Sequence, residues 1–289
     1  MEVVWLIAKR WTKDEIMNKL RTKINEKKPL LFSSAGTGLV AKLLEKAGAD
    51  CISTFSGARL RNNGWGTMSM LWPMQDSNEQ VLNYTEHDII TALKGDAFVC
   101  AFINANDLLR DIRNVLEKLK SIGVMSICHS SPSISDYDKD SHIFNLLNQS
   151  GITFENEIKM LSLAKEMGMV TVAMPFTIED SINMIKNASP DIFCFHAGTT
   201  KGGLAGFDTP YTIEDTAKRT EDAFQEALKI KKDLILLAHG ASLVTPEDGQ
   251  YILDNTSAHG VWTGSATERI PIEKAVLGTA KEFANLKIK

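Results

Sequence analysis

The sequence predicts a single α/β domain, a (β/α)8 TIM barrel, which is preceded by a short helical extension. Three observations favour this fold. A Thr-x-Glu-Asp motif occurs three times after apolar runs, at residues 177–180, 212–215 and 245–248. Eight apolar runs alternate with helical patterns along the 289 residues. The composition, 44% hydrophobic and 24% charged, is that of a globular chain that can bury one large core.

The repeated motif marks the starts of helices. Threonine is a good N-cap, and acidic residues in the first turn bind free N–H groups and complement the helix dipole. Pro246 falls at the first helical position, where its missing N–H has no consequence. The copies are roughly 35 residues apart, about the length of one βα unit. Each interval is therefore expected to hold a strand followed by a capped helix.

The eight apolar runs are expected to be parallel strands, because a strand that helices cover is continuously apolar rather than alternating. They are residues 30–34, 51–55, 97–103, 124–128, 170–174, 192–195, 234–238 and 260–263. The alternative is an open dinucleotide-binding sheet, but Gly36, Thr37 and Gly38 supply only the start of its glycine motif. Eight units in one chain favour the barrel.

Residues 1–28 are predicted to form an extension before one barrel domain, residues 29–289. The apolar residues 3–7 are too few to span a bilayer and precede an amphipathic helix with Ile16, Leu20 and Ile24 on one face. An apolar segment that contains a tryptophan is typical of an interaction surface. We expect a homo-oligomer whose interface includes this segment; the alternative is that the segment plugs its own barrel.

Charge and cysteine content restrict the partners and the compartment. A net charge of −4 argues against a nucleic-acid partner, and no segment predicts a membrane partner. The four cysteines lie in apolar runs without C-x-x-C spacing, which is typical of reduced, buried thiols in a cytoplasmic protein.

Proton-transfer residues are expected at the carboxyl ends of the strands, where TIM barrels hold their active sites. His196 and His239 follow adjacent strands and are themselves followed closely by glycine. Neutral imidazole can move a proton at pH 7, so we predict that both are catalytic; the alternative is a pair of hydrogen-bonded rim residues. Glu157 and Glu268 are candidates to orient them. Glu157 lies on the apolar stripe of a helix over residues 154–167, and the alternative is a first-turn acid that complements the dipole.

Anion binding is expected at the glycine-rich strand ends. Gly240, Gly264 and Ser265 follow the seventh and eighth strands, the usual phosphate site of a barrel, with a merely tight turn as the alternative. The other predicted substrate-binding residues are Gly36, Thr37, Gly38, Thr200 and Gly202, with Arg59 and Arg61 as bidentate clamps. Each arginine could instead form a surface salt bridge. The long connection from Ser56 to a helix capped by Ser77 is expected to be a functional lid.

Together these motifs resemble the phosphoenolpyruvate hydrolase-like TIM-barrel family. The likeness runs from about residue 28 to residue 283. It is carried by Gly36-Thr37-Gly38-Leu39, residues 47–50, Ser56-Gly57 with Arg59 and Arg61, residues 196–203, His239-Gly240 with residues 246–248, and residues 264–269 with 271–273. The family also supplies the barrel half of plant proteins resembling the tomato mosaic virus resistance protein, and barrels fused to bacterial regulators.

The resemblance implies a barrel that acts on a small phosphorylated or carboxylated acid as a hydrolase or lyase. The fourth strand end, residues 128–132, departs from the Asn-Phe-Pro-like segment of the family. The related phosphonopyruvate and isocitrate lyase-type barrels hold Mg²⁺ with a carboxylate cluster and use a Lys-x-Cys-Gly loop. This sequence contains neither feature, so their metal-assisted mechanism is not expected.

Two other functions remain open. One is a non-catalytic barrel that senses or binds a metabolite. The other is a zinc hydrolase with His129, His196 and His239 as ligands, although no H-x-H or H-E-x-x-H spacing supports it. No motif requires a cofactor, and a divalent metal is possible but unsupported.

Overall fold

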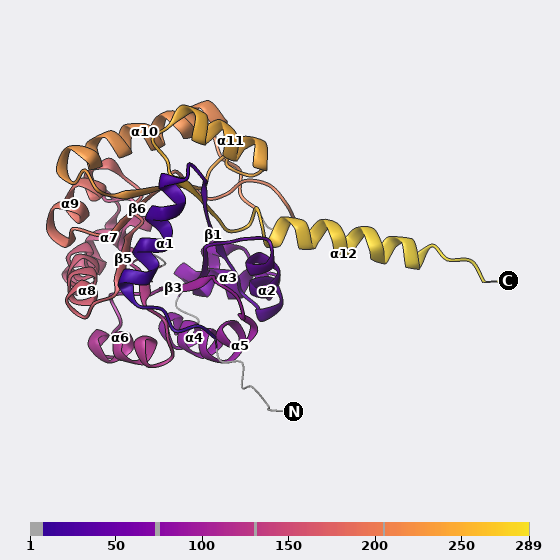
Figure 1. Ribbon diagram of the computed structural model, residues 1–289, viewed down its shortest axis with the longest axis horizontal. Helices are drawn as coiled ribbons and strands as arrows, with labels where there is room; N and C mark the ends of the chain where they lie inside the picture. The colour runs from indigo at the N-terminus through magenta and orange to yellow at the C-terminus, as the bar shows by residue number, and fades with distance from the viewer. Residues whose placement is uncertain (1–7, 73–75, 130–131, 205, 289) are drawn as a thin grey trace.

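Eight parallel strands close into a barrel, in which each strand pairs with the next along the chain and β8 returns to β1 (Figure 1). A computed structural model of the protein describes residues 8–72, 76–129, 132–204 and 206–288. The strands are β1 (Leu30–Ser34), β2 (Cys51–Thr54), β3 (Phe98–Phe102), β4 (Ser126–Cys128), β5 (Val170–Ala173), β6 (Ile192–His196), β7 (Ile235–His239) and β8 (Gly260–Thr263). The predicted (β/α)8 barrel is confirmed, and strand boundaries differ from the predicted ones by at most two residues.

Helical segments follow every strand. They are α2 (Gly38–Lys46), α3 (Ser56–Asn62), η1 (Thr67–Leu71), α4 (Ser77–Tyr84), η2 (Thr85–Ile89), α5 (Ile90–Ala92), α6 (Ile112–Ser121), η3 (Ile134–Asp136), α7 (His142–Gln149), α8 (Phe154–Glu166), α9 (Ile178–Ala188), α10 (Ile213–Ile230), α11 (Pro246–Asn255) and α12 (Arg269–Ala284). Among those in the described ranges, none combines the length and the apolar character needed to cross a membrane.

The three repeated motifs begin helices as predicted. Thr177, Thr212 and Thr245 are the N-caps of α9, α10 and α11. Each hydroxyl oxygen accepts the N–H of the aspartate three residues later, at 3.0, 3.1 and 3.2 Å. These local contacts set the start of each helix after its strand.

The helix start in the connection after β2 differs from the prediction. Its helix α4 is capped by Asp76 rather than by Ser77, because the Asp76 carboxylate is the stronger acceptor and binds the Glu79 N–H at 2.9 Å. The preceding segment folds as α3 and η1 against one another. In its described residues the connection therefore builds a packed wall at the carboxyl end of the barrel.

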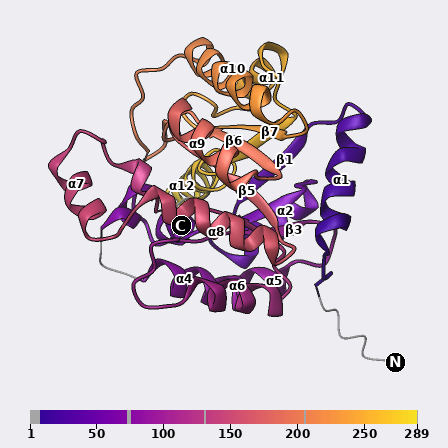
Figure 2. The ribbon, with the colours of Figure 1, turned by 90° about the vertical axis from the view of Figure 1, so that its left-hand side faces the viewer.

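Helix α1 (Lys13–Asn25) covers the amino-terminal end of the barrel. Ile16 and Leu20 are fully buried against the barrel interior, as the amphipathic pattern predicts. Lys13 and Lys23 bind Asp191 and Asp50, which immediately precede β6 and β2, at 2.7 and 2.6 Å. Figure 2 shows α1 and α7 at opposite ends of the barrel. The apolar residues 3–7, predicted to form an oligomer interface, lie outside the described residues.

Candidate functional site

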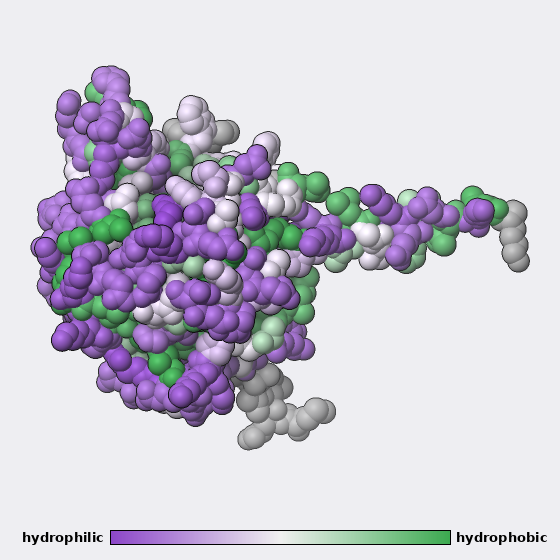
Figure 3. Space-filling model, turned by 90° about the horizontal axis from the view of Figure 1, so that it is seen from above, coloured by the Kyte–Doolittle hydropathy of each residue, from purple (hydrophilic) through white to green (hydrophobic). Residues whose placement is uncertain are grey.

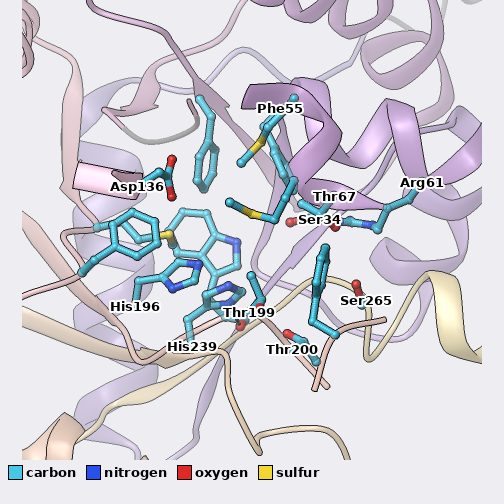
Figure 4. A pocket seen from close by; sticks show the side chains of 18 residues that line it. Ser34, Phe55, Arg61, Thr67, Asp136, His196, Thr199, Thr200, His239 and Ser265 are labelled. Atoms are coloured by element: carbon cyan, nitrogen blue, oxygen red, sulfur yellow. Dashed lines mark hydrogen bonds between the residues drawn. The ribbon is translucent and has the colours of Figure 1, made fainter. Parts of the chain in front are cut away.

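The carboxyl ends of the strands surround one pocket, with an empty volume of about 610 Å³ that includes space open to solvent (Figure 4). Its described lining consists of Ser34, Phe55, Arg61, Thr67, Met68, Met70, Phe102, Asp136, Met174, Phe176, His196, Thr199, Thr200, Phe207, His239, Trp262, Gly264 and Ser265. Polar groups gather on two sides. Asp136, His196 and His239 lie on one side, and Ser34, Arg61, Thr67 and Ser265 lie on the other.

His196 and His239, hereafter the histidine pair, end β6 and β7 and face each other in register. Their ring centroids are 4.7 Å apart. The Nδ1 of His239 lies 2.6 Å from the Trp262 carbonyl oxygen. Because a carbonyl can only accept, Nδ1 carries the proton and Nε2 keeps a lone pair. The structure therefore fixes His239 in the tautomer that can act as a base.

His196 stacks on Phe176, with ring centroids 4.2 Å apart. Its Nδ1 is buried and has no hydrogen-bond partner among the described residues. Burial lowers the pKa of His196 well below its ordinary value, and His239 beside it lowers it further. Burial also lowers the pKa of His239, to which the positive charge of Arg61 contributes. Both imidazoles are consequently neutral at pH 7.

Asp136, which was not predicted from the sequence, is a further titratable group of the pocket. It ends η3 and accepts the Ser133 N–H at 3.1 Å. Burial raises the pKa of Asp136 to about 7, and the charge of Glu157 contributes to the increase. A carboxyl with this pKa is partly protonated at neutral pH and can donate a proton. The Ser-x-x-Asp spacing of a capping box was the one local signal for it.

Glu157 does not line the pocket. It is fully buried and accepts hydrogen bonds from His129 Nδ1 at 2.6 Å, Ser133 Oγ at 2.9 Å and the Ile134 N–H at 3.0 Å. His129 Nε2 in turn accepts the Met174 N–H at 2.9 Å. We call Glu157, His129 and Ser133 the sealed cluster. It holds the η3 turn that carries Asp136.

Arg61 and Glu268 form a buried ion pair, with side chains that are 2% and 1% exposed. Glu268 Oε2 accepts from Arg61 Nε at 3.1 Å and Nη2 at 2.5 Å. Its Oε1 accepts from the Gly36 N–H at 2.6 Å and from Asn62 at 2.8 Å. Both oxygens are engaged, so Glu268 positions Arg61. Among the described residues, Arg61 Nη1 has a single, long hydrogen bond, to Thr67 at 3.4 Å. It faces the pocket with Gly264 and Ser265.

The expectation that a glutamate orients the histidine pair is wrong, because Glu157 and Glu268 bond other partners. Of the predicted substrate-binding residues, the pocket lining includes Arg61, Thr200, Gly264 and Ser265. Outside that lining are Gly36, Thr37, Gly38, Arg59, Gly202 and Gly240.

The residues outside the pocket lining have local structural contacts. Arg59 pairs with Asp88 at 2.9 Å, and Thr37 caps α2. Gly240 has a φ of +90°, and a Cβ there would lie 2.0 Å from the Gly198 carbonyl oxygen, so a glycine is needed where β6 and β7 end.

The described residues do not form a metal centre. No three His, Cys, Asp or Glu side chains among them are grouped to hold a metal ion. The zinc hypothesis required His129, whose two ring nitrogens bind Glu157 and Met174 instead. Asp136 is the single carboxylate among the described lining residues, so the carboxylate cluster of an Mg²⁺ barrel does not form here.

Comparisons with known proteins agree with the barrel and its sequence motifs. The family model of phosphoenolpyruvate hydrolase-like proteins matches residues 15–286. The ToMV susceptible protein tm-1(GCR26) of Solanum lycopersicum is 29% identical over 272 residues, which are 94% of this chain and 35% of that protein. The chain thus spans about a third of the length of this curated relative.

Solved structures of other proteins share the fold, and two of them illustrate the likeness. Phosphoenolpyruvate phosphomutase from Streptomyces platensis subsp. rosaceus superposes with a TM-score of 0.60 and 12% identity, over 93% of this chain and 87% of that one. Phosphonopyruvate hydrolase, in complex with oxalate and Mg²⁺, gives a TM-score of 0.54 and 16% identity, over 95% and 86%. At such identities the likeness shows a common barrel.

Proposed function

The chain belongs to the phosphoenolpyruvate hydrolase-like family, and we propose that its pocket binds a small phosphorylated or carboxylated acid and acts on it by acid/base chemistry. The reaction class would be hydrolysis or lysis. One observation carries the proposal: a base with a fixed tautomer and a buried arginine line the same pocket.

The side of the pocket with Arg61 suits an anion. The guanidinium is held from behind by Glu268, which leaves Nη1 available to a ligand. Ser34 and Ser265 add hydroxyl donors on the same side (Figure 4). Charge-assisted hydrogen bonds from arginine are strong, and burial of the pair strengthens them further. We therefore assign the phosphate or carboxylate of the substrate to this side.

The opposite side supplies two groups for proton transfer. Hydrolysis and lysis each remove a proton from water or substrate and deliver one to a leaving group. His239 Nε2 is the base, since its Nδ1 is committed to Trp262. Asp136, with a pKa of about 7, is the acid. His196 packs between Phe176 and His239 and limits the space around the base.

Turnover assays test this function. Purified protein is incubated with phosphoenolpyruvate, phosphonopyruvate and related acids, and release of phosphate or pyruvate is measured. We expect turnover of at least one acid, and His239→Ala should lower it by about 10²- to 10⁴-fold. His142→Ala, which removes an exposed imidazole on α7, should leave turnover unchanged. Absence of turnover across the panel, with wild type and His239→Ala alike in every assay, would contradict the proposal.

A second candidate is a barrel that binds such an acid without converting it. The greater length of the curated relative favours it, because a barrel there is joined to further sequence that could respond to a ligand. A thermal-shift screen of the same acids separates the two. A ligand that raises the melting temperature without being consumed indicates a metabolite sensor.

The cellular setting that we propose is cytoplasmic. Cys51, Cys100, Cys128 and Cys194 are free and buried, and a reducing compartment keeps thiols in that state.

A further inference from the structure

The floor of the pocket is apolar, although polar groups gather on two of its sides. It is formed by Phe102 of β3, Met174 after β5 and Trp262 of β8, which are nearly fully buried. The rings of Phe102 and Trp262 meet edge to face, with centroids 5.2 Å apart. The indole Nε1 of Trp262 donates to Ser53 Oγ at 2.9 Å, inside the barrel. Trp262 therefore contributes the carbon atoms of its indole, and not a hydrogen-bond donor, to the pocket.

Half-buried apolar side chains continue this surface towards the opening of the pocket. They are Met68 of η1, Phe176 after β5 and Phe207 after β6. We call them, with Phe102, Met174 and Trp262, the apolar lining. Figures 1 and 3 show α12 projecting from a barrel whose surface, in the view of Figure 3, is largely hydrophilic. Apolar surface that lines a pocket is stabilised when an apolar group of a ligand covers it.

The pocket holds little positive charge with which to balance a ligand that carries several negative charges. Arg61 is the single lysine or arginine among the described lining residues, and Glu268 already pairs with it. The internal residues outside the described ranges, 73–75, 130–131 and 205, include no lysine or arginine. The histidine pair is neutral at pH 7, because burial lowers the pKa of both imidazoles. One carboxylate can be matched beside Arg61, whereas a further charge would lack a partner.

Asp136 makes a second negative group on the ligand still less favourable. It lies across the pocket from Arg61 (Figure 4), and its pKa of about 7 leaves it partly ionised at neutral pH. An ionised carboxyl repels a phosphate or a second carboxylate. Arg59, Arg269 and Lys201 lie outside the described lining, where the two arginines pair with other carboxylates and Lys201 is exposed to solvent. The pocket therefore suits a ligand with a single negative charge.

We propose that the ligand is a monocarboxylic acid with an aromatic substituent, whose carboxylate meets Arg61 and whose ring packs on the apolar lining. An aromatic ring suits this surface, because rings pack edge to face on phenylalanine and tryptophan, and thioethers make favourable contacts with ring edges. A phosphoenolpyruvate-sized acid is charged over most of its surface and would leave the apolar lining in contact with water. This assignment rests on the proposed function, because both place the anion beside Arg61, and it narrows the class of acid.

Isothermal titration calorimetry of the full chain at neutral pH tests the ring and the charge separately. 3-Phenylpropionate should bind about 10- to 100-fold more tightly than propionate, which lacks the ring, because burial of a phenyl group is worth this much in affinity. It should bind about tenfold more tightly than benzylmalonate, which adds a second carboxylate to the same skeleton. Phosphoenolpyruvate should also bind more weakly than 3-phenylpropionate. No binding of 3-phenylpropionate, equal affinities for it and propionate, or tighter binding of either multiply charged acid would overturn the proposal.

A pair of variants tests where the ring lies. Met68→Gln keeps the length of the side chain but places an amide in the apolar lining, so the preference for 3-phenylpropionate over propionate should fall about tenfold. The affinity for propionate should stay unchanged. Met17→Gln, at a half-buried methionine of α1 at the other end of the barrel, is the matched control and should keep the wild-type preference. The same preference in Met68→Gln as in wild type would contradict the packing of the ring on the apolar lining.

Binding and turnover together separate this assignment from the proposed function. Turnover of phosphoenolpyruvate, with no preference for the ring in binding, would support the proposed function and overturn the aromatic ligand. Preference for 3-phenylpropionate, with no turnover of any acid in the panel, would support the aromatic ligand and contradict acid/base catalysis. That second result would favour the barrel that binds an acid without converting it.

Discussion

His129 and His239 both lie where a strand of the barrel ends, yet the ring nitrogens of the two imidazoles differ in their hydrogen bonding. In the sealed cluster, His129 is fully buried and both ring nitrogens are bonded, to Glu157 and to Met174. In the histidine pair, His239 Nδ1 is bonded to Trp262, while Nε2 has no hydrogen-bond partner among the described residues and remains for the pocket. The comparison shows that hydrogen-bond saturation, rather than position at a strand end, separates a structural histidine from a reactive one.

The largest expected effect is the loss of activity in His239→Ala. Removing a general base lowers turnover by about 10²- to 10⁴-fold. The free energy of unfolding should change by about 1 kcal/mol or less, since one hydrogen bond to Trp262 is lost. Steady-state kinetics on the acids of the panel and urea unfolding measure the two quantities. Wild-type turnover in His239→Ala, or severe destabilisation of this variant, would contradict the assignment of His239 as reactive rather than structural.

The reverse pattern is expected in the sealed cluster. Glu157→Gln replaces an acceptor oxygen by a donor where Ser133 and Ile134 already donate. The free energy of unfolding should fall by about 2–4 kcal/mol, because buried donors lose their partner. Urea unfolding measures this. Glu155→Gln, an exposed neighbour on α8, is the control and should stay within about 0.5 kcal/mol of wild type. Equal effects at both positions would show that Glu157 is not a structural centre.

The contacts of the sealed cluster and of the pocket could be predicted only in part from the sequence. Helical spacing indicated that the face of α8 with Glu157 is buried, and it is. The partners of Glu157, however, are His129, Ser133 and Ile134, which approach it only through tertiary packing. The same packing turns Asp136 toward the pocket, so a residue in an apparently ordinary turn becomes a candidate acid. Arg61 was predicted, but its partner Glu268, 207 positions away, was assigned to the histidines instead.

The fold was more predictable, because its signals are local. Continuous apolar strands and threonine caps repeat with each unit, and each cap forms within four residues. The course of α12 was not predictable in this way. Its apolar positions have the same spacing as those of a helix that packs on its own barrel, and its direction is set by the bonds of Arg269 to a distant loop.

An intermediate effect is expected from pH, through Asp136. Its folded-state pKa of about 7 lies above the ordinary value of 3.8, so the folded protein binds more protons between these values. The free energy of unfolding of wild type should therefore fall, relative to Asp136→Asn, as pH rises from about 4 to about 7. Urea unfolding of both proteins at several pH values measures the difference.

Wild type is compared with Asp136→Asn because the histidine pair changes the free energy of unfolding with pH in the opposite direction to Asp136. The pKa values of His196 and His239 are lowered, so stability from these groups is lost as pH falls below the ordinary value of 6.5. Their contribution cancels in the comparison. If Asp136 is also the acid, turnover should decline above a pH of about 7. Parallel stability curves for wild type and Asp136→Asn would show that Asp136 ionises normally.

The smallest expected effect concerns the anion side of the pocket. In Gly264→Ala the new Cβ would lie 3.7 Å from Arg61 Nη1 and 3.8 Å from Ser34 Oγ, which is ordinary contact. The fold should tolerate the change, but the methyl group takes the space in which an anion would meet Arg61. Substrate affinity should weaken about tenfold, equivalent to about 1.4 kcal/mol, with turnover at saturation nearly unchanged. Gly278→Ala on α12, where a Cβ would meet no atom within 4 Å, is the control for adding a methyl group. A higher KM for Gly264→Ala than for Gly278→Ala would place the anion beside Arg61. Equal KM values would show that the anion binds elsewhere in the pocket.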